Sequence, residues 1–220
     1  MKELSGRALI ASRCARFFKD GDFVSLGIGI PAMCANYLPE GVQIWLQSDI
    51  GIIGVGPVPS WEEADPDLID AGAGPASILP GGSICDIGTS FALIRGGHLD
   101  ATVLGTLQVD QEGNLANWTI PGKLLPGMGG GMDLCTGVKK IIVATDHCEK
   151  SGQSKILKKC TLPLTAAKCV TDIVTERCYF RVTEKGLVLE ELAPGYTVED
   201  IRACTQAEFL VSDQLGSMLE

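Results

Sequence analysis

The sequence predicts a single α/β domain that spans residues 1–220. Apolar runs typical of strands alternate along the chain with segments of helical periodicity, and no linker or change in composition divides them. The 27 glycines cluster at the ends of the apolar runs, where the loops of an α/β protein need unusual backbone angles. Because 45% of the residues are apolar, we expect an extensive core rather than a disordered chain.

The N-terminal part of the chain alternates helix and strand. Apolar residues that recur every three or four positions indicate the first helix, and Pro31 suits the first turn of the second. We expect, in order, a helix over Leu4–Lys19, a strand over Phe23–Leu26, a helix from Pro31 to Tyr37, a strand over Gln43–Gln47 and a surface excursion over 57–75.

The rest of the chain continues the alternation. Thr197-Val198-Glu199-Asp200 is a good N-terminal capping sequence, and the apolar run that begins at Lys140 is typical of a buried strand. We expect a turn over Pro80–Gly82, a helix over Ser90–Arg95, extended runs over Thr102–Leu104, Gln108–Asp110 and Leu115–Ile120, a strand over Lys140–Thr145, extended runs over Cys169–Val174, Tyr179–Val182 and Leu187–Leu189, a helix over Thr197–Cys204 and a strand over Phe209–Ser212.

Charge and composition exclude several classes of function. The net charge is −9 and no basic cluster exceeds two residues, which argues against a nucleic-acid partner. No apolar run approaches the roughly 18 residues of a membrane span, and the first seven residues lack the apolar segment of a secretory signal, so we expect a cytoplasmic protein. The nine scattered cysteines indicate reduced thiols, mostly in the core, and no metal site.

Two glycine clusters are candidates for ligand contact. Gly27 and Gly29 lie between a strand and a helix start, where backbone N–H groups approach anions, but the third glycine of a dinucleotide fingerprint is missing. Spacing alone slightly favours a tight turn without a ligand. The stretch Gly127–Gly131 exposes several amides, as an oxyanion hole requires, and composition favours this no more than a flexible loop.

Asp49 is the third candidate, because it follows an apolar strand where ligands bind in open α/β sheets. An aspartate that caps its own turn is the commoner case, and without further information we favour that interpretation. His98 fits a structural role near a turn better than a base. His147, beside Asp146, is predicted to be a solvated surface residue.

Several segments in one order resemble a known family. They are Leu26–Pro31, Gln47-Ser48-Asp49-Ile50-Gly51, Leu93–Asp100, Val103–Gly105 with Gln108–Asp110, Gly113–Trp118, Pro121–Lys123, Gly127–Gly130 and Met132–Leu134. The chain is similar over almost its whole length to the beta subunit of family I coenzyme A transferases, the group of acetate/butyrate–acetoacetate and succinyl–3-oxoacid enzymes. The resemblance implies a three-layer domain with a mixed, mostly parallel sheet.

The resemblance also implies a mechanism. In the family, a beta-subunit glutamate in a Ser-Glu-Asn-Gly turn attacks the acyl-CoA, forms an anhydride and then a glutamyl–CoA thioester, and passes CoA to a second acid. Asp49 stands at the position of that glutamate, and Gly130 corresponds to the backbone donor that holds the oxyanion. Gly27 and Gly29 would lie beside the CoA or acyl group, as would Gly129 of the second glycine cluster. Coenzyme A is then a substrate, and neither a permanent cofactor nor a metal is expected.

The sequence departs from the family at the nucleophile. Asp49 is one methylene shorter than glutamate, which withdraws the carboxylate by on the order of 1 Å, and Ile50 replaces the asparagine. Three interpretations stay open: Asp49 is still the nucleophile, which we favour; Asp49 is a general base of an acyl-CoA thioester hydrolase; or the chain is an inert assembly subunit. The resemblance implies an alpha-subunit partner and an assembly of two alpha and two beta chains.

Overall fold

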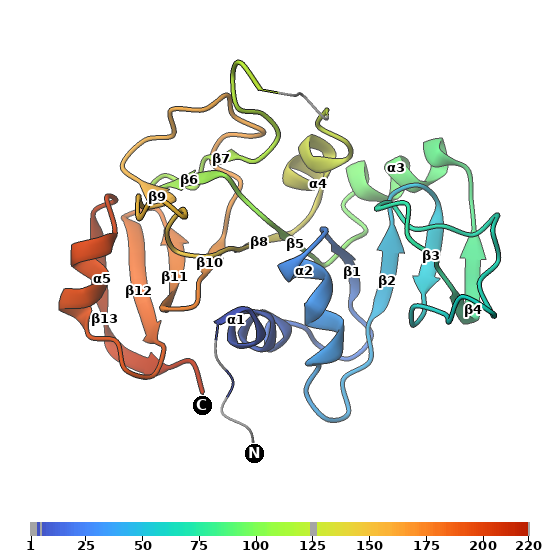
Figure 1. Ribbon diagram of the computed structural model, residues 1–220, viewed down its shortest axis with the longest axis horizontal. Helices are drawn as coiled ribbons and strands as arrows, with labels where there is room; N and C mark the ends of the chain where they lie inside the picture. Colours follow the sequence, from blue (N-terminus) through green and yellow to red (C-terminus); the bar gives the residue numbers. More distant parts are fainter. Residues whose placement is uncertain (1–3, 5, 124–126, 220) are drawn as a thin grey trace.

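A block of five parallel strands forms the centre of a ten-stranded sheet in the computed structural model, which describes residues 4, 6–123 and 127–219 (Figure 1). The order of this block is β10 (Asp172–Val174), β8 (Lys140–Ala144), β5 (Ala101–Leu104), β1 (Phe23–Leu26) and β2 (Trp45–Ser48). Strands that are covered on both faces need near-continuous apolar runs, and all residues of β5 are buried.

Antiparallel strands extend the sheet at both edges. Beyond β2 lie β3 (Ile52–Val55) and β4 (Ile78–Ile84), and beyond β10 lie β11 (Cys178–Thr183), β12 (Gly186–Leu192) and β13 (Phe209–Ser217), of which the last pairs parallel with β12. Among the described residues, five pairings of this sheet are parallel and four are antiparallel. The mixed, mostly parallel sheet that the resemblance implied is therefore confirmed.

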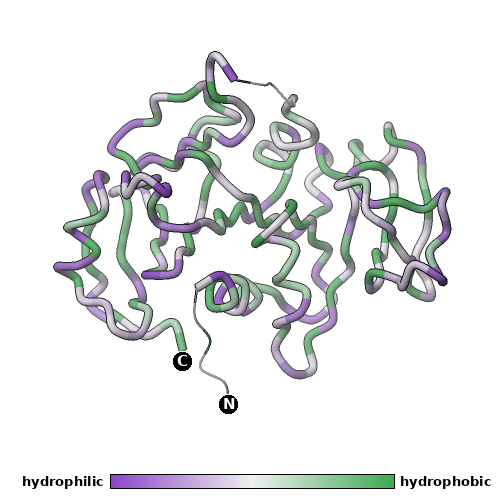
Figure 2. The backbone as a smooth tube through the Cα atoms, in the orientation of Figure 1, coloured by the Kyte–Doolittle hydropathy of each residue, from purple (hydrophilic) through white to green (hydrophobic). Residues whose placement is uncertain are grey.

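Helices cover both faces of the sheet and make three layers. Along β8, Ile141 and Val143 belong to one core cluster, whereas Ile142 and Ala144 belong to another on the opposite face. The first cluster packs against α3 (Ile87–Arg95), α4 (Gly131–Gly137) and α5 (Val198–Cys204), and the second against α1 (Gly6–Ala15) and the region of α2 (Ile30–Met33) with its following 3₁₀ turn (Cys34–Asn36). The hydrophobic stretches of the chain converge on the central strands (Figure 2).

A small second sheet, at the upper left in Figure 1, consists of β7 (Leu115–Ala116), β6 (Gln108–Asp110) and β9 (Ile156–Leu157). The expected return strand over Leu115–Ile120 is thus wrong beyond Ala116. The side-chain amide of Asn117 donates to the Gly105 carbonyl at 3.1 Å, and the backbone amide of Asn117 donates to the Thr165 hydroxyl. Hydrogen bonds that involve side chains therefore replace the strand ladder there.

The first helix is shorter than its periodicity predicts. It ends at Ala15, because Phe17 and Phe18 donate to carbonyls three residues back and tighten the chain into a turn. Leu4 lies outside the helix, and Ser5 lies outside the described residues, as do Met1–Glu3 on which the expected lack of a signal depends.

The turn expected over Pro80–Gly82 is also wrong, because these residues lie inside β4. β4 is the edge strand, where a proline is tolerated, and a Cβ on Gly82 would stand 2.7 Å from the Ile53 carbonyl oxygen of β3. α3 starts three residues earlier than expected, since Asp86 caps it by accepting from the Thr89 amide at 3.0 Å. The predicted cap of α5 is confirmed as a reciprocal pair between Thr197 and Asp200.

Candidate active site

Asp49 opens the tight turn that joins β2 to β3, at the carboxyl end of the parallel block. The Gly51 amide donates to the Ser48 carbonyl at 3.0 Å and closes the turn. Gly51 has φ 121°, and a Cβ there would stand 2.2 Å from the Cys85 carbonyl oxygen. Only glycine fits this position, so contact between two backbones fixes where the Asp49 side chain begins.

The Asp49 carboxylate lies against the second glycine cluster. A Cβ added to Gly130 would stand 2.3 Å from Asp49 Oδ2 and 3.4 Å from Phe91 Cζ. The β2–β3 turn, through Asp49, and helix α3, through Phe91, therefore both lie against Gly130, the residue before helix α4. Our preference for a turn-capping aspartate, drawn from its sequence position alone, took no account of this contact across 81 residues.

Burial sets the electrostatics of this carboxylate. Desolvation raises the pKa of Asp49, and the backbone amides of Ile50, Asp49 and Gly130 oppose that rise by favouring the charged form. A carboxylate with a raised pKa is more basic than an ordinary aspartate and still accepts backbone hydrogen bonds. These properties suit a nucleophile or a general base.

Helices α3 and α4 are joined beside the carboxylate. The Arg95 guanidinium lies 5.5 Å from the centre of the Phe91 ring, and Arg95 Nε donates to Asp133 of α4 at 2.6 Å. The Phe91 ring beside Gly130 is thus backed by an ion pair. Phe91 was not predicted, because an aromatic residue inside an amphipathic helix gives no sequence signal of its contacts.

The other predicted glycines lie at the same end of the sheet. Gly27 directly follows β1, the parallel neighbour of β2, and its amide donates to the Val103 carbonyl at 2.9 Å. Gly29 is exposed with φ 86°, and exposed Gly129 precedes Gly130 with φ 53°. Both conformations favour glycine. Their contact with a ligand stays a prediction.

Asn117 and Thr165 support the glycine cluster, and sequence reasoning assigned neither a role. Thr165 Oγ1 donates to Asn117 Oδ1 at 2.6 Å, and a Cβ on Gly131 would lie 3.6 Å from Thr165 Cγ2. The two side chains come from segments 48 residues apart, so only the fold brings them under α4. The signal available in the sequence was Asn117 itself, which belongs to a segment that carries the family resemblance.

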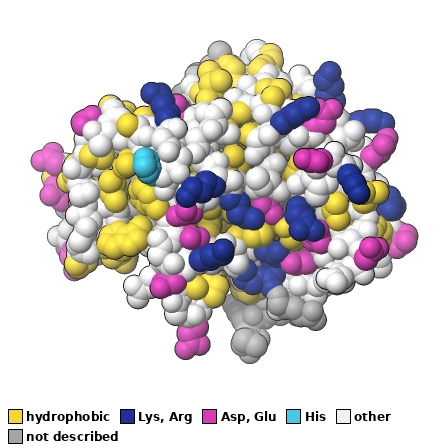
Figure 3. All heavy atoms as spheres, turned by 180° about the vertical axis from the view of Figure 1, so that it is seen from behind, with side chains coloured by type: hydrophobic (Ala, Val, Ile, Leu, Met, Phe, Trp, Pro, Cys, Tyr) yellow, Lys and Arg dark blue, Asp and Glu magenta, His cyan; other side chains and the backbone are white. Residues whose placement is uncertain are grey.

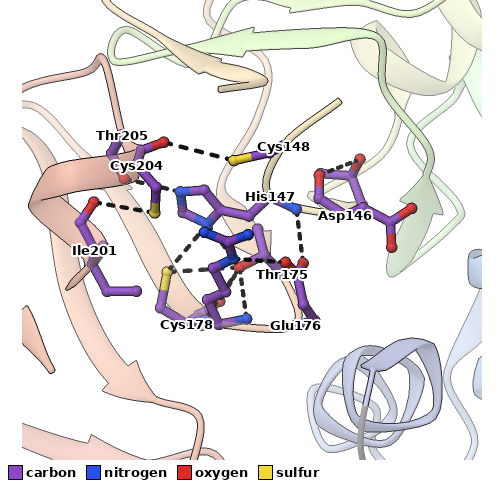
Figure 4. A network of polar contacts seen from close by, with 11 residues as sticks. Asp146, His147, Cys148, Thr175, Glu176, Cys178, Ile201, Cys204 and Thr205 are labelled. Carbon is purple, nitrogen blue, oxygen red and sulfur yellow. Dashed lines mark hydrogen bonds and ion pairs between the residues drawn. The ribbon is translucent and has the colours of Figure 1, made fainter. Parts of the chain in front are cut away.

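His147 is buried, and the prediction of a solvated surface residue is wrong. Its ring nitrogens lie 3.0 Å from Thr175 Oγ1 and 2.9 Å from Thr205 Oγ1, as Figure 4 shows, and the side chain is fully buried. Burial lowers the pKa of His147 to about 4, with a further contribution from Arg177. Thr205 follows α5, 58 residues away, which local sequence could not reveal. His98, by contrast, is exposed.

The cysteines are free thiols, four of them buried and five partly buried. Burial raises the pKa of most of the thiols whose pKa is shifted, and it raises the pKa of Cys160 to about 12. These thiols are therefore poor nucleophiles. Within the described ranges, His, Cys, Asp and Glu side chains form no group of three that could hold a metal ion, and no helix is long and apolar enough to cross a bilayer.

Known proteins resemble this chain over nearly its whole length. The family model described as coenzyme A transferase matches residues 7–203. The chain belongs to the coenzyme A transferase family, as a family I beta subunit. It is 52% identical to acetate CoA-transferase subunit beta of Escherichia coli K12, over 97% of this chain and 98% of the relative. It is 54% identical to the subunit of the same name from Haemophilus influenzae, over 98% of this chain and 96% of that relative.

A mouse relative is longer. Succinyl-CoA:3-ketoacid coenzyme A transferase 2B of Mus musculus is 48% identical over 96% of this chain, which spans 41% of that polypeptide. Among solved structures, the acyl-CoA transferase YdiF of E. coli O157:H7 has a TM-score of 0.76 at 24% identity. The match covers 99% of this chain and 44% of the YdiF chain. The decarboxylase AibA/AibB has a TM-score of 0.69 at 20% identity, and the match covers 98% of this chain and 89% of the AibA/AibB chain. These two show the shared fold.

Proposed function

We propose that this CoA-transferase subunit moves CoA between a short-chain acyl-CoA, such as acetoacetyl-, acetyl- or butyryl-CoA, and a free short-chain acid, with Asp49 as the nucleophile. The contact between the Asp49 carboxylate and the Gly130 backbone carries the proposal, since it joins a nucleophile to an oxyanion donor. The relatives at 52% and 54% identity favour transfer over a hydrolase or an inert subunit.

The proposed steps balance without a cofactor. A carboxylate oxygen of Asp49 attacks the thioester carbonyl, the C–S bond breaks, and CoA leaves as a thiolate with the electron pair. The thiolate then attacks the aspartyl carbonyl of the anhydride, which releases the first acid and leaves an aspartyl–CoA thioester. A second carboxylate repeats the two steps in reverse and leaves with CoA. The Gly130 amide, which faces Asp49 in the free chain, would hold the oxyanions, while Gly27, Gly29 and Gly129 would lie along the CoA or acyl group.

An alpha subunit is the implied partner, because the relatives of matching length are named beta subunits. The proposed assembly has two alpha and two beta chains. Large apolar side chains are exposed at residues near the Asp49 turn, with Ile84 69% and Ile87 60% exposed on either side of Cys85, whose carbonyl contacts Gly51. Hydrophobic side chains gather on the half of the molecule that holds β2–β4 (Figure 3). We assign this face to the alpha subunit, whose basic residues would also offset the −9 charge toward anionic CoA.

The test uses the chain assembled with its alpha subunit. Acetoacetyl-CoA with acetate should give acetyl-CoA, and borohydride added after acyl-CoA should reduce the thioester and modify the peptide that contains Asp49. Asp49→Asn, which keeps the shape of the side chain, should give neither result. Thioester loss without dependence on acetate would overturn transfer in favour of hydrolysis, and modification elsewhere would overturn the assignment of Asp49.

A further inference from the structure

Three buried polar side chains form a row beneath the Asp49 turn. In the register of the central strands, Ser25 of β1 lies beside Gln47 of β2 on one side and beside Thr102 of β5 on the other. All three are less than a tenth exposed, and Thr102 is fully buried. Their sequence neighbours Val24 and Val103 pack toward α1, so the row projects to the opposite face, which α3 covers.

Gln47 spans from this row to α3. Its Nε2 donates to Ser90 Oγ at 2.8 Å and to the Ser90 carbonyl oxygen at 3.2 Å. A carbonyl only accepts, so the amide group must face it with nitrogen, and Oε1 is directed away from Ser90. Oε1 is buried and has no hydrogen-bond partner among the described residues, and the same holds for Thr102 Oγ1.

Each unpartnered oxygen has a cost. A buried polar atom without a hydrogen bond costs about 1–3 kcal/mol, so two in one row are improbable unless something between them supplies the bonds. Their strands are separated by β1, which puts their backbones roughly 10 Å apart. The residue between them is Ser25, whose side chain is the smallest of the three.

We propose that a structural water molecule binds above Ser25 and bridges Gln47 and Thr102. It would donate to Gln47 Oε1 and accept from Thr102 Oγ1, with the Ser25 hydroxyl as a third polar neighbour, which matches the three hydrogen bonds typical of buried water. Through Gln47 the water would hold Ser90, and the next residue, Phe91, contacts the point where Gly130 and Asp49 meet. Gln47 and Thr102 are thereby positioning residues, a role that rests on the proposed function, whereas the water site does not.

The water site is tested without any activity measurement. A crystal structure of the chain at about 1.5 Å resolution should show a peak within hydrogen-bond distance of Gln47 Oε1 and Thr102 Oγ1. Thr102→Val should lower the melting temperature, because it leaves the water short of a partner. A site without water would show no peak, and Thr102→Val would raise the melting temperature by removing an unpaired hydroxyl. Thr119→Val is the matched control, since it removes another buried hydroxyl that has no partner among the described residues and lies outside the row.

The positioning role is tested in the assembled enzyme. Gln47→Met keeps the length of the side chain but loses its hydrogen bonds, and should lower kcat by about 10- to 100-fold with little change in KM. It should also move the acid limb of the pH–rate profile to lower pH, because displacement of the Phe91 ring from Gly130 would expose Asp49 to more water. A lower melting temperature with unchanged kcat and pH profile would overturn positioning. If the wild type transferred no CoA, the proposed function and the positioning role would fail together, and the density would still decide the water site.

Discussion

The carboxylate of Asp49 occupies space that only the lack of a side chain at Gly130 provides: a methyl group at residue 130 would stand 2.3 Å from Oδ2. The glycine therefore serves the site in two ways. Its amide faces the carboxylate and favours the ionised form, and its bare α-carbon lets the carboxylate approach. Since the two residues belong to different elements, the position of the proposed nucleophile depends on how α4 packs against the β2–β3 turn.

Gly130→Ala should reduce CoA transfer by about 100-fold, because the added methyl displaces the carboxylate by on the order of 1 Å. The control is Gly131→Ala, whose methyl would meet its nearest neighbour, Thr165, at an ordinary 3.6 Å. Steady-state rates of the two assembled variants give the comparison. Equal losses in both would mean that the glycine stretch is sensitive throughout and that the Asp49 contact is not decisive.

Asp49→Glu should raise the rate of transfer, because the longer side chain carries the carboxylate toward the thioester by on the order of 1 Å. The measurement is the initial rate of acetyl-CoA formation from acetoacetyl-CoA and acetate. Asp49→Asn, which lacks a nucleophilic oxygen, should be inactive. An unchanged rate in Asp49→Glu would argue against Asp49 as the attacking residue.

The pH–rate profile should report the burial of Asp49. Attack requires the ionised carboxylate, and burial raises its pKa, so kcat/KM should fall as the pH drops through a value above that of an ordinary aspartate. Phe91→Ala lets water reach the carboxylate and should move this acid limb to lower pH. Leu93→Ala, which trims α3 where it packs on the core, should leave the limb in place. An acid limb that stays in place in Phe91→Ala would mean that this ring does not influence the pKa of Asp49.

Stability should fall in acid because of His147. Its pKa is about 4 in the folded chain and about 6.5 when unfolded, so the unfolded state binds more protons between these values. The free energy of unfolding should be unaffected by this group above pH 6.5 or so and should lose up to about 3 kcal/mol as the pH falls to 4. Urea unfolding across this range checks the slope. His147→Gln should abolish this contribution, whereas His98→Gln, at an exposed position, should retain it.

Association with the alpha subunit should depend on the apolar face near the turn. The double variant Ile84→Asp and Ile87→Asp should lose the complex in size-exclusion chromatography, because two charges would be desolvated at the contact. Leu210→Asp is the control: Leu210 is 53% exposed, but it lies on β13 at the opposite edge of the sheet from β4. Retention of the complex by the double variant would place the alpha subunit elsewhere.

Sequence predicted the parts of this fold that local patterns encode. β1 was placed with its observed bounds, and the cap of α5 was read from Thr197 and Asp200. Long-range contacts decided the rest. Pro80 lies in a strand because β4 pairs with β3 at the edge of the sheet, and His147 is buried because Thr205, which follows α5, lies against its ring. At the site, the family resemblance singled out Asp49 and Gly130 together, while Phe91 became visible only in three dimensions.

The backbone contact between Gly51 and Cys85 has an evolutionary consequence. Because two main chains meet at Gly51, a change of side chain at residue 49 or 50 would leave the Gly51–Cys85 contact in place. A mutation at residue 49 would therefore exchange the reactive side chain while the backbone that positions it stays the same.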